Sequence, residues 1–220
     1  MKQSTIKGIF TEQKKLFTIN PEACKHISVY SERLVTRGGQ EYRSWNPYRS
    51  KLAAAFHKGL QFSLSPDAQV LYLGAATGTT VSHISDIVQK GLIYAVEQSP
   101  LAMQKLLRVC EQRPNIIPIL EDAYHPDRYS AIVSPVHLVY QDISQRNQAE
   151  IFLKNIRRYL QPKGMGLIMV KARSIDVSLK PEQCYQQVID YLKDHGATIV
   201  TKLDLSPFET DHAALLITME

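Results

Sequence analysis

Four side chains that could move a proton stand at the ends of apolar segments. Asp142 and Lys171 each follow a short apolar run that is typical of a buried strand. Lys51 lies in an expected helix, and His212 lies in the turn before the last apolar run. A lysine directly after a buried strand is unusual, because burying an ammonium costs free energy unless it is paired. If the four converge, they form a site with two amines, one carboxylate and one imidazole.

A second group of residues is typical of a nucleoside-cofactor site. A loop follows the first apolar strand of the core and opens a helix, with the sequence Gly74-Ala75-Ala76-Thr77-Gly78-Thr79-Thr80. Its small residues let a ligand approach the backbone, and the helix start offers free N–H groups. Glu97 ends the next strand, where a carboxylate could accept both hydroxyls of an adenosine ribose. Asp122 follows the third strand and could accept the adenine amino group.

The spacing within this loop argues against two common phosphate-binding motifs. Ala76 stands where a GxGxxG dinucleotide motif would have its second glycine, and no Gly-Lys-Ser/Thr of a P-loop follows. A cationic cofactor needs no phosphate cradle, so a glycine–acid pair of this form favours S-adenosylmethionine. The alternative is an ordinary strand-to-helix turn with an acidic cap. Glu97 and Asp122, at successive strand ends, favour the cofactor site.

The four proton-moving residues fit methylation of a hydroxyl group. A lysine cation would stabilise the developing alkoxide, and a neutral lysine would act as general base. Lys51 would lower the pKa of Lys171 and Asp142 would raise it, so the protonation state of Lys171 stays open. We expect Lys171 to be the main catalytic residue and Asp142 to orient the lysine and the cofactor methyl. His212 would position the ribose, although taken alone it could equally be a surface histidine.

Alternating strands and helices position these residues. Strands are expected at 70–73, 92–97, 116–120, 138–140, 167–170, 198–205 and 213–218, and helices at 46–59, 79–89, from 99 onward, and around 152–159 and 185–192. This alternation predicts a mostly parallel α/β sheet covered on both faces, with ligands beyond the carboxyl ends of the strands. Residues 1–44 hold shorter runs, including 27–30, between turns. They predict a small N-terminal antiparallel β subdomain before a methyltransferase domain at 45–220.

Composition places the chain among ordinary globular proteins. Of its 220 residues, 44% are hydrophobic and 21% are charged, which excludes wholesale disorder. The net charge of +5 favours an anionic partner such as nucleic acid, but only mildly. Three widely separated cysteines form no CxxC pair, so no metal site is expected and a reducing compartment is favoured. No apolar run approaches a membrane span and no secretory signal is visible, so we expect a cytoplasmic protein.

Six segments, in order, resemble motifs of the fibrillarin-like RNA 2′-O-methyltransferases. They are residues 41–54, 72–83, 116–123, 140–142, 171–176 and 207–212. The resemblance spans about residue 41 to the C-terminus and is closest to the short, archaeal-type form without a Gly/Arg-rich extension. It implies a Rossmann-like class I fold that uses S-adenosylmethionine, with a seven-stranded, mostly parallel sheet after the small β subdomain.

The resemblance also implies roles for individual residues. The family's Lys-Asp-Lys-His tetrad falls on Lys51, Asp142, Lys171 and His212. Its cofactor contacts fall on Thr79, Thr80, Glu97, Gln98, Asp122, Ala123, Asp142, Ile143, Ser144 and Gln145, beside the loop residues Gly74, Ala75 and Gly78. Four positions depart from the family's usual residues, namely Gln98, Leu101, Tyr124 and Ser144. Because they flank the expected site, Arg43, Arg49 and Arg173 are the expected RNA contacts.

Family resemblance further implies work inside a box C/D ribonucleoprotein. A guide RNA would select a nucleotide in ribosomal RNA, or in transfer RNA, and a Nop5-type scaffold protein and an L7Ae-type protein would hold the guide. The modest net charge fits this division of labour, because base pairing rather than the enzyme would read the sequence. Two alternatives remain, a stand-alone methyltransferase for another substrate and a scaffold subunit of the particle with weak or no catalysis.

Overall fold

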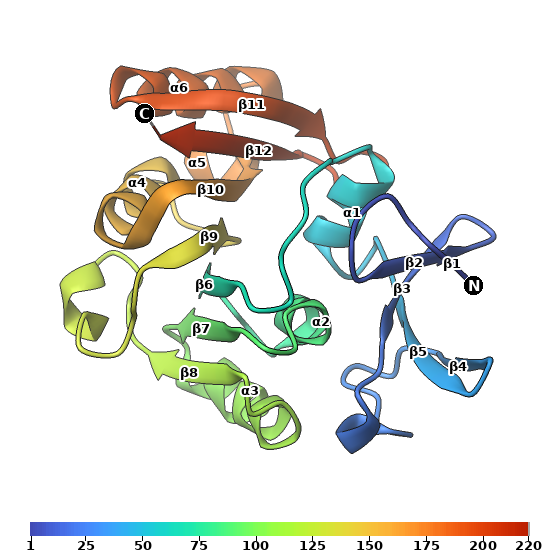
Figure 1. Cartoon of the computed structure of the whole chain (residues 1–220). Helices are drawn as coiled ribbons and strands as arrows, with labels where there is room; N and C mark the ends of the chain where they lie inside the picture. The colour runs from blue at the N-terminus through green and yellow to red at the C-terminus, as the bar shows by residue number, and fades with distance from the viewer. Residues whose placement is uncertain (220) are drawn as a thin grey trace.

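A seven-stranded sheet forms the centre of the molecule (Figure 1). In this computed structural model, which describes residues 1–219, the strand order is β11-β12-β10-β9-β6-β7-β8. The strands are β6 (Gln69–Leu73), β7 (Leu92–Glu97), β8 (Ile116–Leu120), β9 (Val136–Gln141), β10 (Leu160–Lys171), β11 (Ala197–Asp204) and β12 (His212–Met219). Neighbouring strands are parallel except at β12, which runs antiparallel to both β10 and β11. The predicted mostly parallel, seven-stranded sheet is confirmed.

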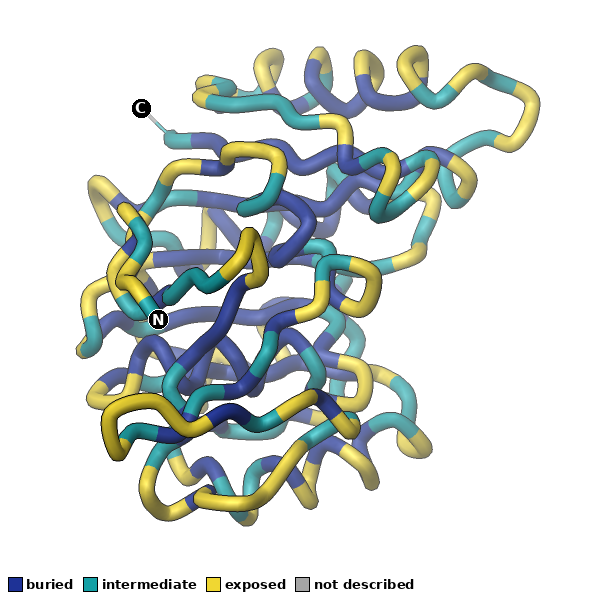
Figure 2. Tube along the Cα trace, turned by 90° about the vertical axis from the view of Figure 1, so that its right-hand side faces the viewer, coloured by how far each residue is buried: buried dark blue, intermediate teal, exposed yellow. Residues whose placement is uncertain are grey.

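Helices cover both faces of this sheet. They are α1 (Lys51–His57), α2 (Thr79–Ile87), α3 (Pro100–Gln112), α4 (Gln148–Tyr159), α5 (Ala172–Ile175) and α6 (Pro181–Asp194), with short 3₁₀ turns at Glu22–Cys24 and Pro126–Tyr129. Val70 and Tyr72 of β6 pack in one apolar cluster with α1, α2 and α3, while Leu71 and Leu73 pack in a second cluster with α4 and α6. This alternation explains why the strand reads as a continuous apolar run. The central strands are buried along most of their length (Figure 2).

A smaller antiparallel sheet lies beside α1 and α2 (Figure 1). Its order is β1-β2-β3-β5-β4, from β1 (Lys2–Gln3), β2 (Ile9–Glu12), β3 (Lys15–Ile19), β4 (Leu34–Arg37) and β5 (Gln40–Trp45). Ile9, Leu16 and Trp45 share one apolar cluster with Leu52 and Ile84 of α1 and α2. The small sheet therefore packs onto the large one through a common core.

Two local expectations are wrong. Residues 27–30 form no strand, because the Glu32 carboxylate accepts hydrogen bonds from the amides of Val29 and Tyr30 and holds them in a turn. The first helix begins at Lys51 rather than after Asn46, since the Asn46 side chain accepts from the Tyr48 amide in a turn of its own. The Ser50 hydroxyl caps the helix instead, accepting from the Ala53 amide. This later start places Lys51 in the first turn.

Among residues 1–219, no helix is both long and apolar enough to cross a lipid bilayer. Cys24, Cys110 and Cys184 are free, and the last two lie in helices as expected.

Candidate active site

A pocket of about 180 Å³ opens beyond the carboxyl ends of β6, β7, β8 and β9. It is lined by Gly74, Ala76, Val96, Glu97, Gln98, Glu121, Asp122, Ala123, Asp142, Ile143, Ser144 and Gln145. Nine of these twelve are residues that the sequence predicts as cofactor contacts. Parallel strands end at the same edge of a sheet, so four chain segments far apart in sequence meet there.

Gly74 lets the loop after β6 pack against the segment after β9. Its φ of +82° is left-handed, and a Cβ at this position would collide with the Asp142 carbonyl and lie 2.8 Å from Ile143 Cγ2. The Asp142 amide donates to the Leu73 carbonyl at 2.9 Å, which extends the β6–β9 pairing to the edge. A side chain at residue 74 would push Asp142 out of place, so only glycine fits this position.

The Glu97 carboxylate is fixed by two backbone amides. Oε2 accepts from the Ala76 amide at 2.8 Å, and Oε1 accepts from the Ser99 amide at 2.8 Å. Ala76 takes a left-handed φ of +48° to direct its N–H to this carboxylate. Each carboxylate oxygen keeps a further lone pair, so Glu97 can still accept from two hydroxyls of a ribose.

Four predicted cofactor contacts lie outside the lining of this pocket. They are Ala75, Gly78, Thr79 and Thr80. Gly78 starts α2 with a φ of +94°, and a Cβ there would lie 2.9 Å from Val109 of α3. The Thr80 hydroxyl donates to Ser50 Oγ at 3.0 Å, which ties α2 to the cap of α1. In this structure these residues shape the loop and anchor it to the helices.

The four proton-moving residues gather at the same edge of the sheet, with one pairing that differs from expectation. Lys51 Nζ lies 3.0 Å from Asp142 Oδ1, and the two side chains are 20% and 19% exposed. Lys171 Nζ instead contacts Ser144 Oγ at 3.4 Å. The carboxylate therefore orients Lys51, whereas we expected it to orient Lys171. Lys171 and His212 are direct cross-strand partners in β10 and β12.

Burial favours the neutral imidazole form of His212. Burial lowers its pKa, and the Lys51 cation lowers it further against the opposing effect of the Thr210 carbonyl. Nδ1 lies 2.7 Å from that carbonyl, which can only accept, so Nδ1 carries the proton. The other ring nitrogen, Nε2, is therefore a hydrogen-bond acceptor in the neutral ring.

Gln148 positions Lys171, and no pattern in the sequence indicates this role. This buried amide accepts from the Lys171 N–H at 3.0 Å and donates to the Lys171 carbonyl at 3.2 Å. It also donates to the Gln145 carbonyl at 3.1 Å, so one side chain joins the end of β10 to the cofactor loop. A glutamine at a helix start has no periodic pattern, and only the three-dimensional contacts show its role.

Arg43 is a structural residue, and the prediction that it contacts RNA is wrong. Its side chain is fully buried between the two sheets, 2.6 Å from both Glu32 and Asp86, and it donates to Ser82 Oγ at 2.9 Å. These partners use the guanidinium, so no phosphate can reach it. The alternation of β5, where Glu41, Arg43 and Trp45 point inward, is the pattern that places it there.

The other two predicted RNA contacts are accessible. Arg49 is exposed in the turn before α1, with its guanidinium 5.8 Å from the centre of the Tyr30 ring. Arg173 is 54% exposed and pairs with Asp211 at 2.8 Å.

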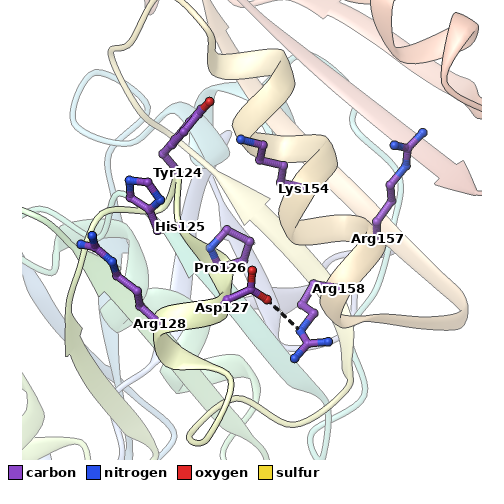
Figure 3. Close-up of a pocket in the computed structure, with 8 residues that line it drawn as sticks. All are labelled: Tyr124, His125, Pro126, Asp127, Arg128, Lys154, Arg157 and Arg158. Atoms are coloured by element: carbon purple, nitrogen blue, oxygen red, sulfur yellow. Dashed lines mark ion pairs between the residues drawn. The ribbon is translucent and has the colours of Figure 1, made fainter.

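A basic depression of about 490 Å³ lies between α4 and the 124–128 segment (Figure 3). Lys154 lies over the Tyr124 ring, 3.4 Å from its centre, and pairs with Glu150 at 3.0 Å. Arg158 pairs with Asp127 at 3.6 Å, the contact drawn as a dashed line in Figure 3. Most of the positive charge of this depression is neutralised by neighbouring carboxylates, which fits a solvated helix face.

Residues 1–220 match the sequence model of the family described as Fibrillarin. The chain belongs to the fibrillarin family. A fibrillarin-like rRNA/tRNA 2′-O-methyltransferase of Methanothermobacter thermautotrophicus is 47% identical over 211 residues, covering 96% of this chain and 93% of that protein.

Solved structures agree over the whole chain. The fibrillarin of a fibrillarin/Nop5p complex superposes with a TM-score of 0.91 at 43% identity, covering all of both chains. An Aeropyrum pernix fibrillarin with natively bound S-adenosyl-L-methionine has a TM-score of 0.87 at 41% identity, covering 99% of this chain and 97% of that one. The Rossmann-like methyltransferase fold implied by the sequence is therefore confirmed.

The pocket of this fibrillarin-family chain has the donors and acceptors that an adenosyl cofactor needs. Glu97 presents an immobilised carboxylate for ribose hydroxyls, and Asp122 presents a second carboxylate for an amino group. The Gly74 backbone approaches the segment at Asp142 so closely that no side chain fits between them. A sulfonium cation beside Asp142 would find a carboxylate, and nothing in the lining requires a phosphate.

Proposed function

We propose that this chain transfers a methyl group from S-adenosylmethionine to the 2′-hydroxyl of a ribose in ribosomal or transfer RNA. It does so as the catalytic subunit of a box C/D ribonucleoprotein, in which a guide RNA selects the nucleotide. One observation carries the proposal. Asp142, which lines the cofactor pocket, pairs with Lys51 at the sheet edge where Lys171 and His212 also lie.

The pocket beyond the strand ends would hold the cofactor. Asp122 and Ala123 would hold its adenine, Glu97 and Gln98 would hold its ribose, and residues 142–145 would flank its sulfonium end. When bound, S-adenosylmethionine supplies an electrophilic methyl group. Gly74, Ala75, Gly78, Thr79 and Thr80 form the loop that supports it.

Each residue of the tetrad has a separate task. Asp142 fixes the Lys51 ammonium, whose positive charge stabilises the oxyanion that develops on the ribose. Neutral His212 accepts a hydrogen bond from the ribose through Nε2, because Nδ1 donates to Thr210. Lys171, whose Nζ contacts no carboxylate among the described residues, accepts the proton of the 2′-hydroxyl in its amine form, as the oxygen bonds to the methyl carbon and the carbon–sulfur bond breaks.

A Nop5-type scaffold protein recruits this subunit to the guide RNA. The fibrillarin chain of a fibrillarin/Nop5p complex superposes over the full length of this chain, which supports the same mode of assembly. An L7Ae-type protein holds the guide through the scaffold. Arg49 and Arg173 contact the RNA beside the tetrad, where both are exposed.

A reconstituted particle with guide RNA, target RNA and labelled S-adenosylmethionine tests the function. We expect Lys171→Ala to lower the rate of methyl transfer by about 10²- to 10⁴-fold, the range for a lost general acid–base group. Cofactor affinity and scaffold binding should stay near those of the unchanged protein, because Lys171 is not among the residues that line the cofactor pocket.

Two results would contradict this function. Full activity of the Lys171→Ala particle would remove the assigned catalytic role. Efficient methylation of an oligonucleotide by the purified chain without a guide would instead favour a stand-alone methyltransferase.

A further inference from the structure

A second pocket joins the small sheet to the turn before α1. It has a volume of about 370 Å³ and includes residues from the β2–β3 hairpin, the end of β5 and the 46–48 turn. We call it the N-terminal pocket and define it by Lys14, Lys15, Arg33, Trp45, Tyr48 and His57, with their neighbours Leu16, Phe17, Ser44, Asn46 and Pro47.

The charge of the N-terminal pocket is positive and unneutralised. Its lining holds three cations, Lys14, Lys15 and Arg33, and no acidic residue. None of the three forms an ion pair within residues 1–219. The depression in Figure 3 is the opposite case, since Lys154 and Arg158 there already have carboxylate partners. Cations without internal partners can bind an external anion without first breaking an ion pair.

The backbone of the hairpin presents two of these cations. Gln13 and Lys14 take left-handed φ values of +51° and +64°, which makes a tight turn between β2 and β3. The turn lies at the ends of β2 and β3, and Lys14 and Lys15 are both exposed there. Two lysines at consecutive positions of a short hairpin can contact neighbouring phosphates of one strand.

Aromatic surface accompanies the charge. Tyr48 is 61% exposed, so most of its side chain is open to a ligand, although its ring packs in a T-shaped arrangement with Phe208 at a centre-to-centre distance of 5.2 Å. Trp45 contributes to the lining, and its buried indole N–H has no acceptor in the described part of the chain. Cations beside an exposed aromatic ring are typical of single-stranded nucleic-acid sites, where bases stack while phosphates are neutralised.

We propose that the N-terminal pocket binds a single-stranded RNA segment, with phosphates on Lys14, Lys15 and Arg33 and a base on Tyr48. The inference rests on the proposed function for the source of that RNA, the strand that carries the methylated ribose. Tyr48 stands three residues before Lys51, whose ammonium pairs with Asp142 at the catalytic edge. In this proposal one strand occupies both places, and the pocket holds the target outside its guide pairing.

Binding of a labelled oligoribonucleotide of about ten nucleotides to the full-length chain tests this site, since such sites span about 4 to 16 nucleotides. We expect Lys14→Ala/Lys15→Ala to weaken binding about tenfold and to flatten the dependence of log K on log salt by about 1.4, at about 0.7 per lost phosphate contact. The control Lys90→Ala/Lys193→Ala removes the same charge from exposed positions elsewhere and should change affinity less than about twofold.

Tyr48→Ala against Tyr48→Phe separates stacking from charge. Loss of the ring should weaken binding about tenfold, and the phenyl ring should restore it, since base stacking needs an aromatic face and no hydroxyl. Because binding is measured without methyl transfer, an inactive particle would not affect the result.

Three outcomes would overturn the proposal. They are equal affinities of the Lys14→Ala/Lys15→Ala and control variants, no binding by the unchanged chain at low salt, and a loss of scaffold-protein capture with RNA affinity unchanged. The last would assign the pocket to an acidic protein surface.

Discussion

Two clusters of this protein use similar residue types for opposite purposes. Between the sheets, Arg43 and Arg113 surround Asp86, and all three side chains are at most 1% exposed. At the catalytic edge, Lys51 and Asp142 are about one-fifth exposed, and Lys171 has no carboxylate partner in the described structure. Charges that are buried and fully paired hold elements together. Charges that are partly exposed and not all paired remain available to a substrate.

The two clusters also differ in the type of cation that they use, arginine in one and lysine in the other. Arginine stays charged and binds carboxylates through a planar fork, which suits the permanent contacts of the inter-sheet cluster. Lysine carries a compact ammonium whose pKa responds to its surroundings, which suits proton transfer. The small sheet is therefore fixed to α2 by arginines, while lysines stand at the catalytic edge.

The largest expected effect is on stability, at the centre of the inter-sheet cluster. Asp86→Asn leaves Arg43 and Arg113 buried with one carboxylate fewer, and breaking such a pair costs about 3–5 kcal/mol. Urea unfolding should show this loss, whereas Asp194→Asn on the exposed end of α6 should leave the free energy of unfolding nearly unchanged. Asp142→Asn should cost less than Asp86→Asn, because the Lys51–Asp142 pair keeps contact with solvent. Equal losses at Asp86 and Asp142 would break the comparison.

A smaller effect is expected on cofactor affinity. Glu97→Gln replaces a carboxylate that accepts from two amides, and its NH₂ group would face one of those donors. Hydrogen bonds to a charged group contribute about 1.5–3 kcal/mol, so calorimetry should find S-adenosylmethionine bound about tenfold to a hundredfold more weakly. Glu111→Gln on the exposed face of α3 is the matched control and should bind normally. An unchanged affinity for Glu97→Gln would remove the ribose-binding role.

The catalytic edge was more predictable from the sequence than its pairings. Asp142 and Lys171 could be found because each follows an apolar strand, and parallel strands bring their carboxyl ends together. The partner of Asp142 could not be found in this way, since Lys51 belongs to a helix that begins later than its sequence pattern predicts and packs beside the strand ends only in the folded chain. The choice between the two lysines depends on tertiary contacts that no local pattern records.

Long-range contacts were the least predictable. Arg43 looked like a phosphate ligand from its place beside the motif, and only the partners Glu32 and Asp86 show that it is internal. The N-terminal pocket joins Lys14 to Tyr48, which belong to segments that the sequence assigns to different subdomains. A local pattern specifies strands and their ends, but the packing of one sheet on another depends on the whole fold.

The smallest expected effect concerns the two buried histidines, one in each region. Burial, with help from the Arg43 and Arg113 cations, holds the pKa of His83 well below its usual value, and the pKa of His212 is lowered as well. The unfolded chain binds protons at these sites near pH 6.5 while the folded chain does not, so stability falls as the pH drops below that value.

Each such histidine contributes up to about 1.4 kcal/mol per pH unit. His83→Gln should therefore reduce the loss of unfolding free energy between about pH 6 and pH 5 by about 1 kcal/mol. His212→Gln should reduce it less, because His212 keeps some contact with solvent and the carboxylates of Glu209 and Asp142 oppose the lowering of its pKa. Urea unfolding at the two pH values measures both. A larger change in this pH-dependent loss for His212→Gln than for His83→Gln would mean that the catalytic edge is more strongly desolvated than the inter-sheet cluster. The charges at the catalytic edge would then not be the more accessible ones.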